Sequence, residues 1–292
     1  MPKVLSLTEL KDDDNFPVLK RVFFTLLGLP LMLFSKRGGD FELSHYRLEL
    51  AKLKQPLRLL QLSDLHFNVY LSQEKVKDWF DVATAQAVDL IVITGDFYDY
   101  LHWSSDDFLL DQLKRLNAPL GVWAVWGNHD YDKSTAYREL FRTKLEQIGI
   151  RLLVNEGVNL RDDLYLAGLD DVREGAPDLD ASFLHYDGER CCLFLSHVPD
   201  VLPLLPDFVD LTLCGHTHGG QIVLPLLGVT QTSSYYGKTF AAGWIDEPVK
   251  AYVARGLGFS TLPIRLNCPG EITVITLETE QPQMAQVKPV MK

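Results

Sequence analysis

The sequence contains little cysteine and no spacing typical of a disulfide framework or a thiolate metal site. Four of its 292 residues are cysteines, and none form a C-x-x-C pair. Cys191 and Cys192 lie in one apolar run, Cys214 ends another, and Cys268 is near the C-terminus. We therefore predict a reducing environment in which the cysteines are small core residues.

Positive charge is also scarce. The chain has 28 Lys and Arg against 39 Asp and Glu, a formal net charge of −11. Such a chain has little long-range attraction for a polyanion, so we expect no nucleic-acid partner. Bound metal ions would still create local positive potential, which leaves a phosphorylated small molecule open as substrate. With 47% hydrophobic residues the chain has enough apolar surface for one large α/β domain or two small ones.

The apolar segment Val22–Phe34 is too short for an easy membrane span. As a helix it would extend roughly 20 Å, against a hydrocarbon core of ~30 Å, and Pro30 would kink it. It is also a poor signal peptide, because Asp12, Asp13 and Asp14 precede it and no small-residue cleavage site follows.

Basic pairs flank this segment on both sides, Lys20-Arg21 before it and Lys36-Arg37 after it. This pattern favours a segment lying at an anionic membrane surface, with the catalytic domain on the cytoplasmic side at the inner face of the cell membrane. The alternatives are a helix that packs on the domain or forms a dimer contact. The sequence leaves the oligomeric state open.

Three regions differ in composition: an extension at residues 1–40, a domain at 41–278, and a loose polar tail at 279–292. Within the domain, apolar strands first alternate with helices, and a strand-rich half follows. Strands are expected at residues 57–62, 90–94, 121–126, 152–154, 158–160, 164–169, 191–195 and 209–214, and between residues 251 and 277. Helices are expected at residues 73–87, 106–116 and 134–148. A turn is expected at Asn155-Glu156-Gly157. Fully apolar strands indicate sheets covered on both faces, so the predicted fold class is α/β.

Polar clusters follow several of these strands, where ligands bind in sheet-centred α/β folds. They are Asp64-Leu65-His66, Gly95-Asp96, Gly127-Asn128-His129-Asp130, His197, and Gly215-His216-Thr217-His218-Gly219. Carboxylate, imidazole and amide oxygen together suit a pair of borderline-hard divalent cations such as Mn, Fe or Zn. The sequence therefore predicts a two-metal hydrolase that attacks a phosphorus ester.

The residues of each cluster suit a particular role in metal binding or proton transfer. Asp64 and His66 are two residues apart on an extended segment, so both can reach one metal ion, and Asp96 has two oxygens with which to bridge two ions. Asn128 offers a side-chain oxygen, which leaves His129 free to donate a proton. Asp130 either orients His129 or caps the following segment.

The histidines at 216 and 218 are the most specific local signal. They have the same i, i+2 spacing and can serve the two ions separately, between glycines that allow a tight backbone path. His197 is favoured as a ligand by its place at the end of an apolar strand.

In this order the clusters resemble the calcineurin-like metallophosphoesterase superfamily, whose pattern is D-x-H, G-D, G-N-H-D/E, H and G-H-x-H. The match is complete over residues 58–218. The stretch from Gly256 to Ile272 resembles a bacterial branch of phosphodiesterases that often carry an N-terminal membrane or export segment. Gly270 replaces the second proline usual in that branch, and a typical export signal is absent.

The resemblance implies a four-layer αββα sandwich of two mixed β-sheets flanked by helices. It implies one metal ion held by Asp64, His66, Asp96 and His218, and another held by Asp96, Asn128, His197 and His216. A water or hydroxide between the ions would attack phosphorus, and His129 would protonate the leaving oxygen. Mn is the expected metal, with Fe or Zn as alternatives.

Aromatic residues follow two of the clusters: Tyr98, Tyr100, His102 and Trp103 after Asp96, and Tyr235, Tyr236, Phe240 and Trp244 within residues 221–247, together with Lys238. Such side chains can contact a lipid chain, a base or a phosphate, and they suit a loop that packs on the sheets equally well.

The predicted function is cleavage of a phosphodiester or pyrophosphate bond near a membrane. The alternatives are a lipid pyrophosphatase of the UDP-2,3-diacylglucosamine type, a soluble cyclic-nucleotide or general phosphodiesterase, and a metal-binding scaffold without catalysis. A nuclease is the remaining option, which the acidic charge disfavours. The intact His129 argues against the scaffold.

Overall fold

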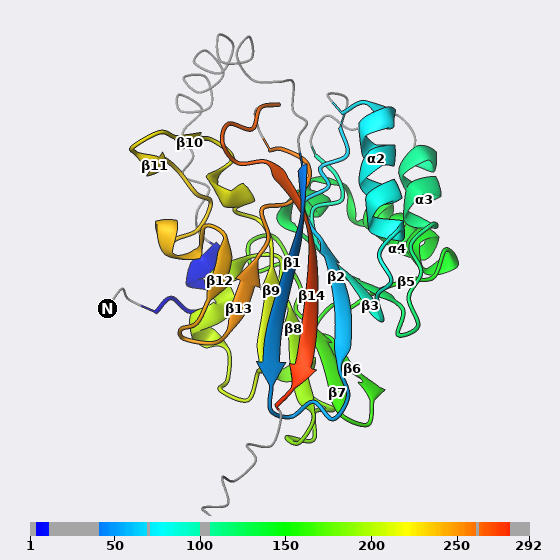
Figure 1. Cartoon of the computed structure of the whole chain (residues 1–292), viewed down its shortest axis with the longest axis vertical. Helices are drawn as coiled ribbons and strands as arrows, with labels where there is room; N and C mark the ends of the chain where they lie inside the picture. Colours follow the sequence, from blue (N-terminus) through cyan, green and yellow to red (C-terminus); the bar gives the residue numbers. More distant parts are fainter. Residues whose placement is uncertain (1–3, 12–40, 69–70, 100–105, 261–262, 281–292) are drawn as a thin grey trace, which may run out of the picture.

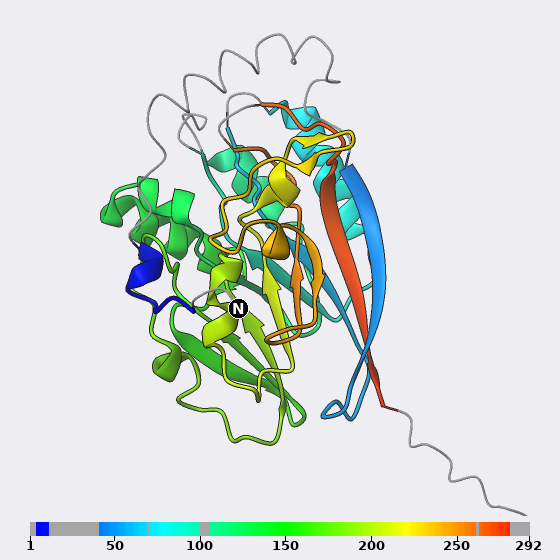
Figure 2. The same ribbon diagram turned by 90° about the vertical axis from the view of Figure 1, so that its left-hand side faces the viewer.

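Two six-stranded sheets lie face to face with helices on their outer sides (Figures 1 and 2). The computed structural model describes residues 4–11, 41–68, 71–99, 106–260 and 263–280, so Val22–Phe34 lies outside the described residues. The predicted αββα sandwich is confirmed. Within the described parts of the chain, no helix has the length and apolarity to cross a bilayer.

Both sheets are mixed. The first has the order β1 (Phe41–Leu50), β14 (Gly270–Thr279), β2 (Leu57–Leu62), β3 (Leu90–Thr94), β4 (Val122–Val125) and β5 (Ile150–Leu152). The second has the order β12 (Gly243–Ile245), β13 (Ala251–Val253), β9 (Leu211–Cys214), β8 (Cys191–Leu195), β7 (Leu164–Gly168) and β6 (Glu156–Arg161). Neighbouring strands are parallel except for β14 with β2 in the first sheet and for the edge strands β12 and β6 in the second.

Three apolar layers hold the sandwich together. The layer between the sheets includes Leu59, Val92 and Leu193, all fully buried. The outer face of the first sheet is covered by α2 (Gln73–Thr84), α3 (Asp107–Leu113) and α4 (Thr135–Gln147). Burial of these side chains removes them from water, and this supplies most of the driving force for folding.

The outer layer of the second sheet is thinner. It is made of η1 (Glu9–Lys11), α5 (Leu179–Ser182), η3 (Pro199–Leu204) and η5 (Gly237–Phe240), with the loops between them. Leu10 is 1% exposed within this layer, and Lys11 Nζ donates a hydrogen bond to the Gly175 carbonyl. Residues 4–11 therefore contact the domain, although their composition belongs to the N-terminal extension.

Local sequence signals explain where two of the helices begin. Ser72 and Ser134 cap α2 and α4, each accepting a hydrogen bond from a backbone N–H three residues on. The buried face of α2 is Val76, Trp79, Phe80 and Ala83, as the spacing predicts. All four cysteines are free and buried, also as predicted.

The turn predicted at Asn155-Glu156-Gly157 is partly wrong, because β6 already begins at Glu156. The chain reverses earlier, where Asn155 adopts a φ of 58° and its side-chain oxygen accepts the Asp170 N–H. The strand predicted at 152–154 likewise ends at Leu152.

Candidate metal centre

Every predicted ligand lies in a loop or at the start of a short 3₁₀-helix that follows a buried strand. Asp64 and His66 follow β2, Asp96 follows β3, and Asn128 follows β4, all in the first sheet. From the second sheet, His197 follows β8, and His216 and His218 follow β9. Since these strands run in one direction and the sheets face each other, their carboxyl ends bring the seven side chains to one place.

The backbone is left-handed at five of these positions. The φ angles are 49° at Asp64, 41° at His66, 55° at Asp96, 71° at His216 and 53° at His218. A residue with a Cβ pays about 1–2 kcal/mol for this conformation, and such residues gather at functional sites. The sharp turns let residues i and i+2 present their side chains to the same space.

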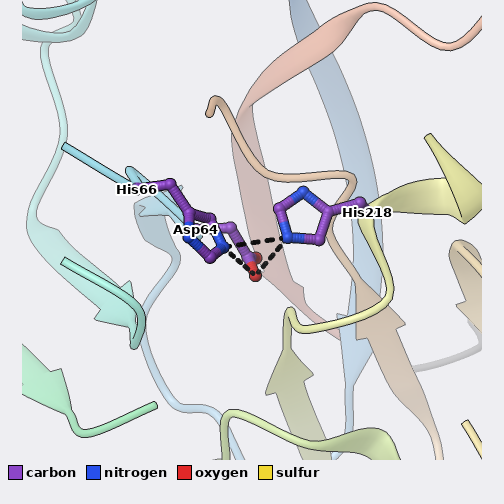
Figure 3. A group of neighbouring side chains, drawn as sticks. All are labelled: Asp64, His66 and His218. Atoms are coloured by element: carbon purple, nitrogen blue, oxygen red, sulfur yellow. Dashed lines mark hydrogen bonds and ion pairs between the residues drawn. The ribbon is translucent and has the colours of Figure 1, made fainter. Parts of the chain in front are cut away.

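The first cluster joins Asp64, His66 and His218 (Figure 3). The Nε2 atoms of the two histidines are 3.0 Å apart, and Asp64 Oδ1 is 3.4 Å from His218 Nε2 and 3.9 Å from His66 Nε2. The three side chains are buried. Three potential ligand atoms therefore surround one small volume.

The second cluster joins Asp96, Asn128, His197 and His216. His197 Nε2 is 3.1 Å from Asp96 Oδ2, 3.2 Å from Asn128 Oδ1 and 3.2 Å from His216 Nδ1. Asp96 Oδ2 also lies 3.3 Å from His66 Nε2 of the first cluster. One carboxylate oxygen is thus in contact with both clusters.

The donor set fits two divalent cations. In the triads Asp64–His66–His218 and Asp96–His197–His216, the ligand atoms all lie within 4.8 Å of one another. Buried carboxylates facing buried imidazole nitrogens are costly unless they are paired or bind metal. Oxygen and imidazole donors without thiolate suit Mn, Fe or Zn. A side chain at Gly127 would collide with the Asp96 carboxylate, so this glycine makes room for the shared ligand.

The electrostatics show how strongly this site attracts positive charge. Burial opposes protonation of His197, but the negative charge of Asp96 outweighs it and raises the pKa of His197 to about 10. Burial holds the pKa values of His216 and His218 well below the usual range, so both are neutral and ready to bind metal. A metal ion would have to displace the proton from the His197 imidazole in order to bind there.

His129 lies at the rim of the site, with 19% of its side chain exposed. Its Nδ1 is 2.9 Å from Asp132 Oδ2, its Nε2 is 3.5 Å from Ser260 Oγ, and its ring centroid is 5.0 Å from that of His66. Burial opposes protonation, but Asp96 and Asp132 raise the pKa of His129 to about 9. At neutral pH His129 therefore carries a proton that it can donate.

Asp130 contacts backbone groups and not the His129 ring. Its carboxylate accepts the N–H groups of Gly127 at 2.9 Å, Asp96 at 3.1 Å and Phe97 at 2.9 Å. These contacts are neither with the His129 ring nor with the following segment, the two partners considered from the sequence; instead the carboxylate ties the loop after β3 to the loop after β4.

The residue beside His129 that sequence reasoning missed is Asp132. Both belong to the 3₁₀-helix η2 (Asn128–Asp132), in which residues i and i+3 lie on the same side. The sequence shows His129 and Asp132 three residues apart, but this spacing indicates a contact only if the segment is known to form a 3₁₀ turn.

Arg265 was also missed as a site residue. Its side chain donates to the carbonyls of Gly258, Gly256 and Arg255, and its Nη2 atom lies 3.2 Å from His218 Nδ1. These hydrogen bonds hold the segment from Arg255 to Arg265 against His218.

The aromatic residues considered for substrate contact are mostly packing residues. Tyr98 and Phe240 are buried in the apolar layers, and Trp244 packs with ring centroids 5.7 Å from Tyr46 and 5.0 Å from Tyr252. Tyr236 packs against Phe240. Tyr100, His102 and Trp103 lie outside the described residues.

Comparisons with known proteins agree with this geometry. The family model described as calcineurin-like phosphoesterase matches residues 57–220. The chain is 34% identical to the "Uncharacterized metallophosphoesterase YkuE" of Bacillus subtilis, covering 76% of this chain and 79% of that one. It is 30% identical to the "Phosphodiesterase YaeI" of Escherichia coli (82% and 89% covered) and 29% identical to the "UDP-2,3-diacylglucosamine pyrophosphatase LpxG" of Chlamydia muridarum (75% and 83% covered).

The chain belongs to the calcineurin-like phosphoesterase family. It is a metal-dependent phosphoric ester hydrolase; the family is dinuclear, and the two clusters provide candidate ligands for the metal ions.

Proposed function

We propose that the protein cleaves a phosphodiester or pyrophosphate bond with a metal pair held by the two clusters. One ion would be bound by Asp64, His66, Asp96 and His218, and the other by Asp96, Asn128, His197 and His216. The observation that carries this proposal is the contact of Asp96 Oδ2 with His66 on one side and His197 on the other, at 3.3 Å and 3.1 Å.

When bound, the metal pair would supply Lewis acidity toward the phosphoryl oxygens and lower the pKa of water to near neutral. The chain's own residues supply the rest of the chemistry. His129 donates a proton to the leaving oxygen, with Asp132 holding its ring through Nδ1. Asp130 keeps Asp96 and the His129 loop in place through their backbones.

A lipid-linked pyrophosphate is the substrate class that we propose first. The similarity to a UDP-2,3-diacylglucosamine pyrophosphatase supports it, as does the basic-flanked apolar segment Val22–Phe34, which would hold the enzyme at the inner face of the cell membrane. The similarity to a phosphodiesterase favours the second candidate, a general phosphodiester. Mn is the proposed metal, with Fe and Zn as alternatives.

The test is a substrate screen of metal-free enzyme reloaded separately with Mn, Fe and Zn. An aryl phosphodiester, a cyclic nucleotide and UDP-2,3-diacylglucosamine would be compared, with metal content measured in each sample. We expect about two metal ions per chain in the active enzyme and the highest kcat/KM on the lipid pyrophosphate. Metal-loaded protein without turnover on any ester would overturn catalysis, and a preference for the soluble diester would overturn the lipid assignment.

The membrane part is tested separately by replacing Leu27 and Leu31 with Asp in the full chain. If Val22–Phe34 lies in the headgroup region, co-sedimentation with phosphatidylglycerol vesicles should fall while turnover of an aryl phosphodiester stays unchanged. Vesicle binding that is insensitive to both substitutions would contradict the proposal.

A further inference from the structure

Two adjacent leucines are strongly exposed on a hairpin that follows the last metal-ligand cluster in the sequence. Five large apolar side chains are exposed among the described residues, and two of them are adjacent: Leu226 at 107% and Leu227 at 67%. They belong to the three-residue connection between β10 (Val223–Leu224) and β11 (Gly228–Val229). Figure 1 shows this hairpin at the upper edge of the molecule, away from α2 and α3.

The backbone at the tip makes a leucine an unusual choice. Leu226 has a φ of 69°, in the left-handed region where glycine or asparagine is favoured and a Cβ adds strain. A turn that served only to reverse the chain would be better formed by either of those residues. The position instead holds a fully exposed apolar side chain, next to a second one and after the exposed Pro225.

The hairpin is joined to the catalytic edge through its first residues. Its first strand begins at Val223, shortly after the 3₁₀-helix η4 (His218–Gly220), and the Val223 N–H donates to the Leu266 carbonyl. Gln221 exchanges two hydrogen bonds with the Ser260 backbone, at 3.1 and 2.9 Å. Ser260 Oγ in turn lies 3.5 Å from His129 Nε2. The base of the hairpin is therefore connected through Gln221 and Ser260 to His129 at the rim of the metal centre.

A bilayer surface fits this tip better than a protein partner does. A stable protein interface buries ~800 Å² on each partner, which two side chains on a protruding turn cannot provide. A lipid surface requires only that a few apolar side chains enter the headgroup region. The exposed Lys238 lies behind the tip, donating from Nζ to the Leu227 carbonyl, where it complements anionic headgroups in an otherwise acidic chain.

We propose that Leu226 and Leu227 insert into an anionic lipid surface and thereby turn the metal centre toward the membrane. This site is separate from Val22–Phe34. It rests on the proposed membrane location of the enzyme but not on its catalysis.

The experiment places a polarity-sensitive fluorophore on Leu226→Cys in the full chain. Because the four native cysteines are buried, the new thiol is the one that labels under native conditions. Leu184→Cys is the matched control, since Leu184 is 73% exposed and lies just beyond α5, at the outer layer of the second sheet. With vesicles of phosphatidylethanolamine and phosphatidylglycerol, the emission at 226 should shift to the blue and be quenched by brominated lipid, and that at 184 should not change.

A second variant tests the contribution to binding. Leu226→Asn with Leu227→Ser should fold normally, because asparagine accepts the left-handed backbone, and should weaken vesicle partitioning by about tenfold or more. Leu184→Ser should bind as the unchanged chain does. A water-like signal at 226 on sedimented vesicles, absence of any vesicle binding, or dimerisation through the tip in gel filtration would each overturn the proposal. Turnover of a soluble aryl phosphodiester in the same samples reports separately on catalysis.

Discussion

The role of Asp130 can be separated from that of Asp132 by two alanine substitutions. Asp130 is 1% exposed, and its carboxylate accepts the backbone N–H groups of Gly127, Asp96, Phe97 and Tyr98. Asp130→Ala leaves these donors buried without acceptors, at about 1–3 kcal/mol each. We expect the free energy of unfolding to fall by about 3–6 kcal/mol, a large part of the ~5–15 kcal/mol typical of a domain.

The measurement is urea unfolding and thermal melting of metal-loaded protein, with metal content determined in parallel. Asp132→Ala is the control, because the Asp132 carboxylate is 20% exposed and contacts His129 Nδ1. We expect its stability to change by less than about 1 kcal/mol, since a partly exposed ion pair contributes little. Its turnover should nevertheless fall, because His129 loses the partner that orients its ring.

The reasoning would be refuted if Asp130→Ala melted like the unchanged protein. It would be equally refuted if Asp130→Ala kept its stability and metal while its turnover fell as expected for Asp132→Ala. In that case Asp130, and not Asp132, would be the residue that orients the histidine.

Three further outcomes are expected. Asp96→Ala should lose both metal ions and turnover together, because it removes the shared ligand, and a variant with two ions and near-normal turnover would exclude the bridge. His129→Ala should keep its metal but lose about 10²–10⁴-fold in turnover, with smaller losses for acidic leaving groups; equal losses for good and poor leaving groups would count against His129 as the acid. The pKa of His197 is raised to about 10, so at neutral pH a proton sits on the imidazole that must be free to bind metal. Metal affinity should therefore rise with pH up to about that value, and titration with Mn²⁺ at pH 7 should release protons. An affinity independent of pH between pH 7 and pH 9 would contradict this.

The place of the metal centre was predictable because its signals are local. The strands before the ligand clusters are mostly apolar runs, and each cluster follows one of them, so the carboxyl ends of the strands fix where the polar side chains meet. The residues that orient His129 and His218 gave no such signal. Asp132 matters through a 3₁₀ turn, and Arg265 reaches its partner across 47 positions in sequence.

The strand β1 shows why part of the fold could not be predicted. Its apolar residues change phase: Phe41 and Leu43 face the helices, whereas Tyr46, Leu48 and Leu50 face the second sheet. A pattern that switches faces midway does not show the regular alternation of a half-buried strand. Its partner β14 begins at Gly270, paired with Phe41, and nothing local indicates that pairing.

The ligands come from both sheets, so metal binding affects the stability of the folded protein as well as its activity. Asp64, Asp96 and Asn128 extend from the first sheet, and His197 and His216 from the second. Ions bound between them would act as a reversible cross-link at one edge of the sandwich. At a free metal concentration 1,000 times Kd, binding stabilises the folded state by about 4 kcal/mol. Metal supply would then govern not only the rate of hydrolysis but also how long each copy of the enzyme resists unfolding and proteolysis.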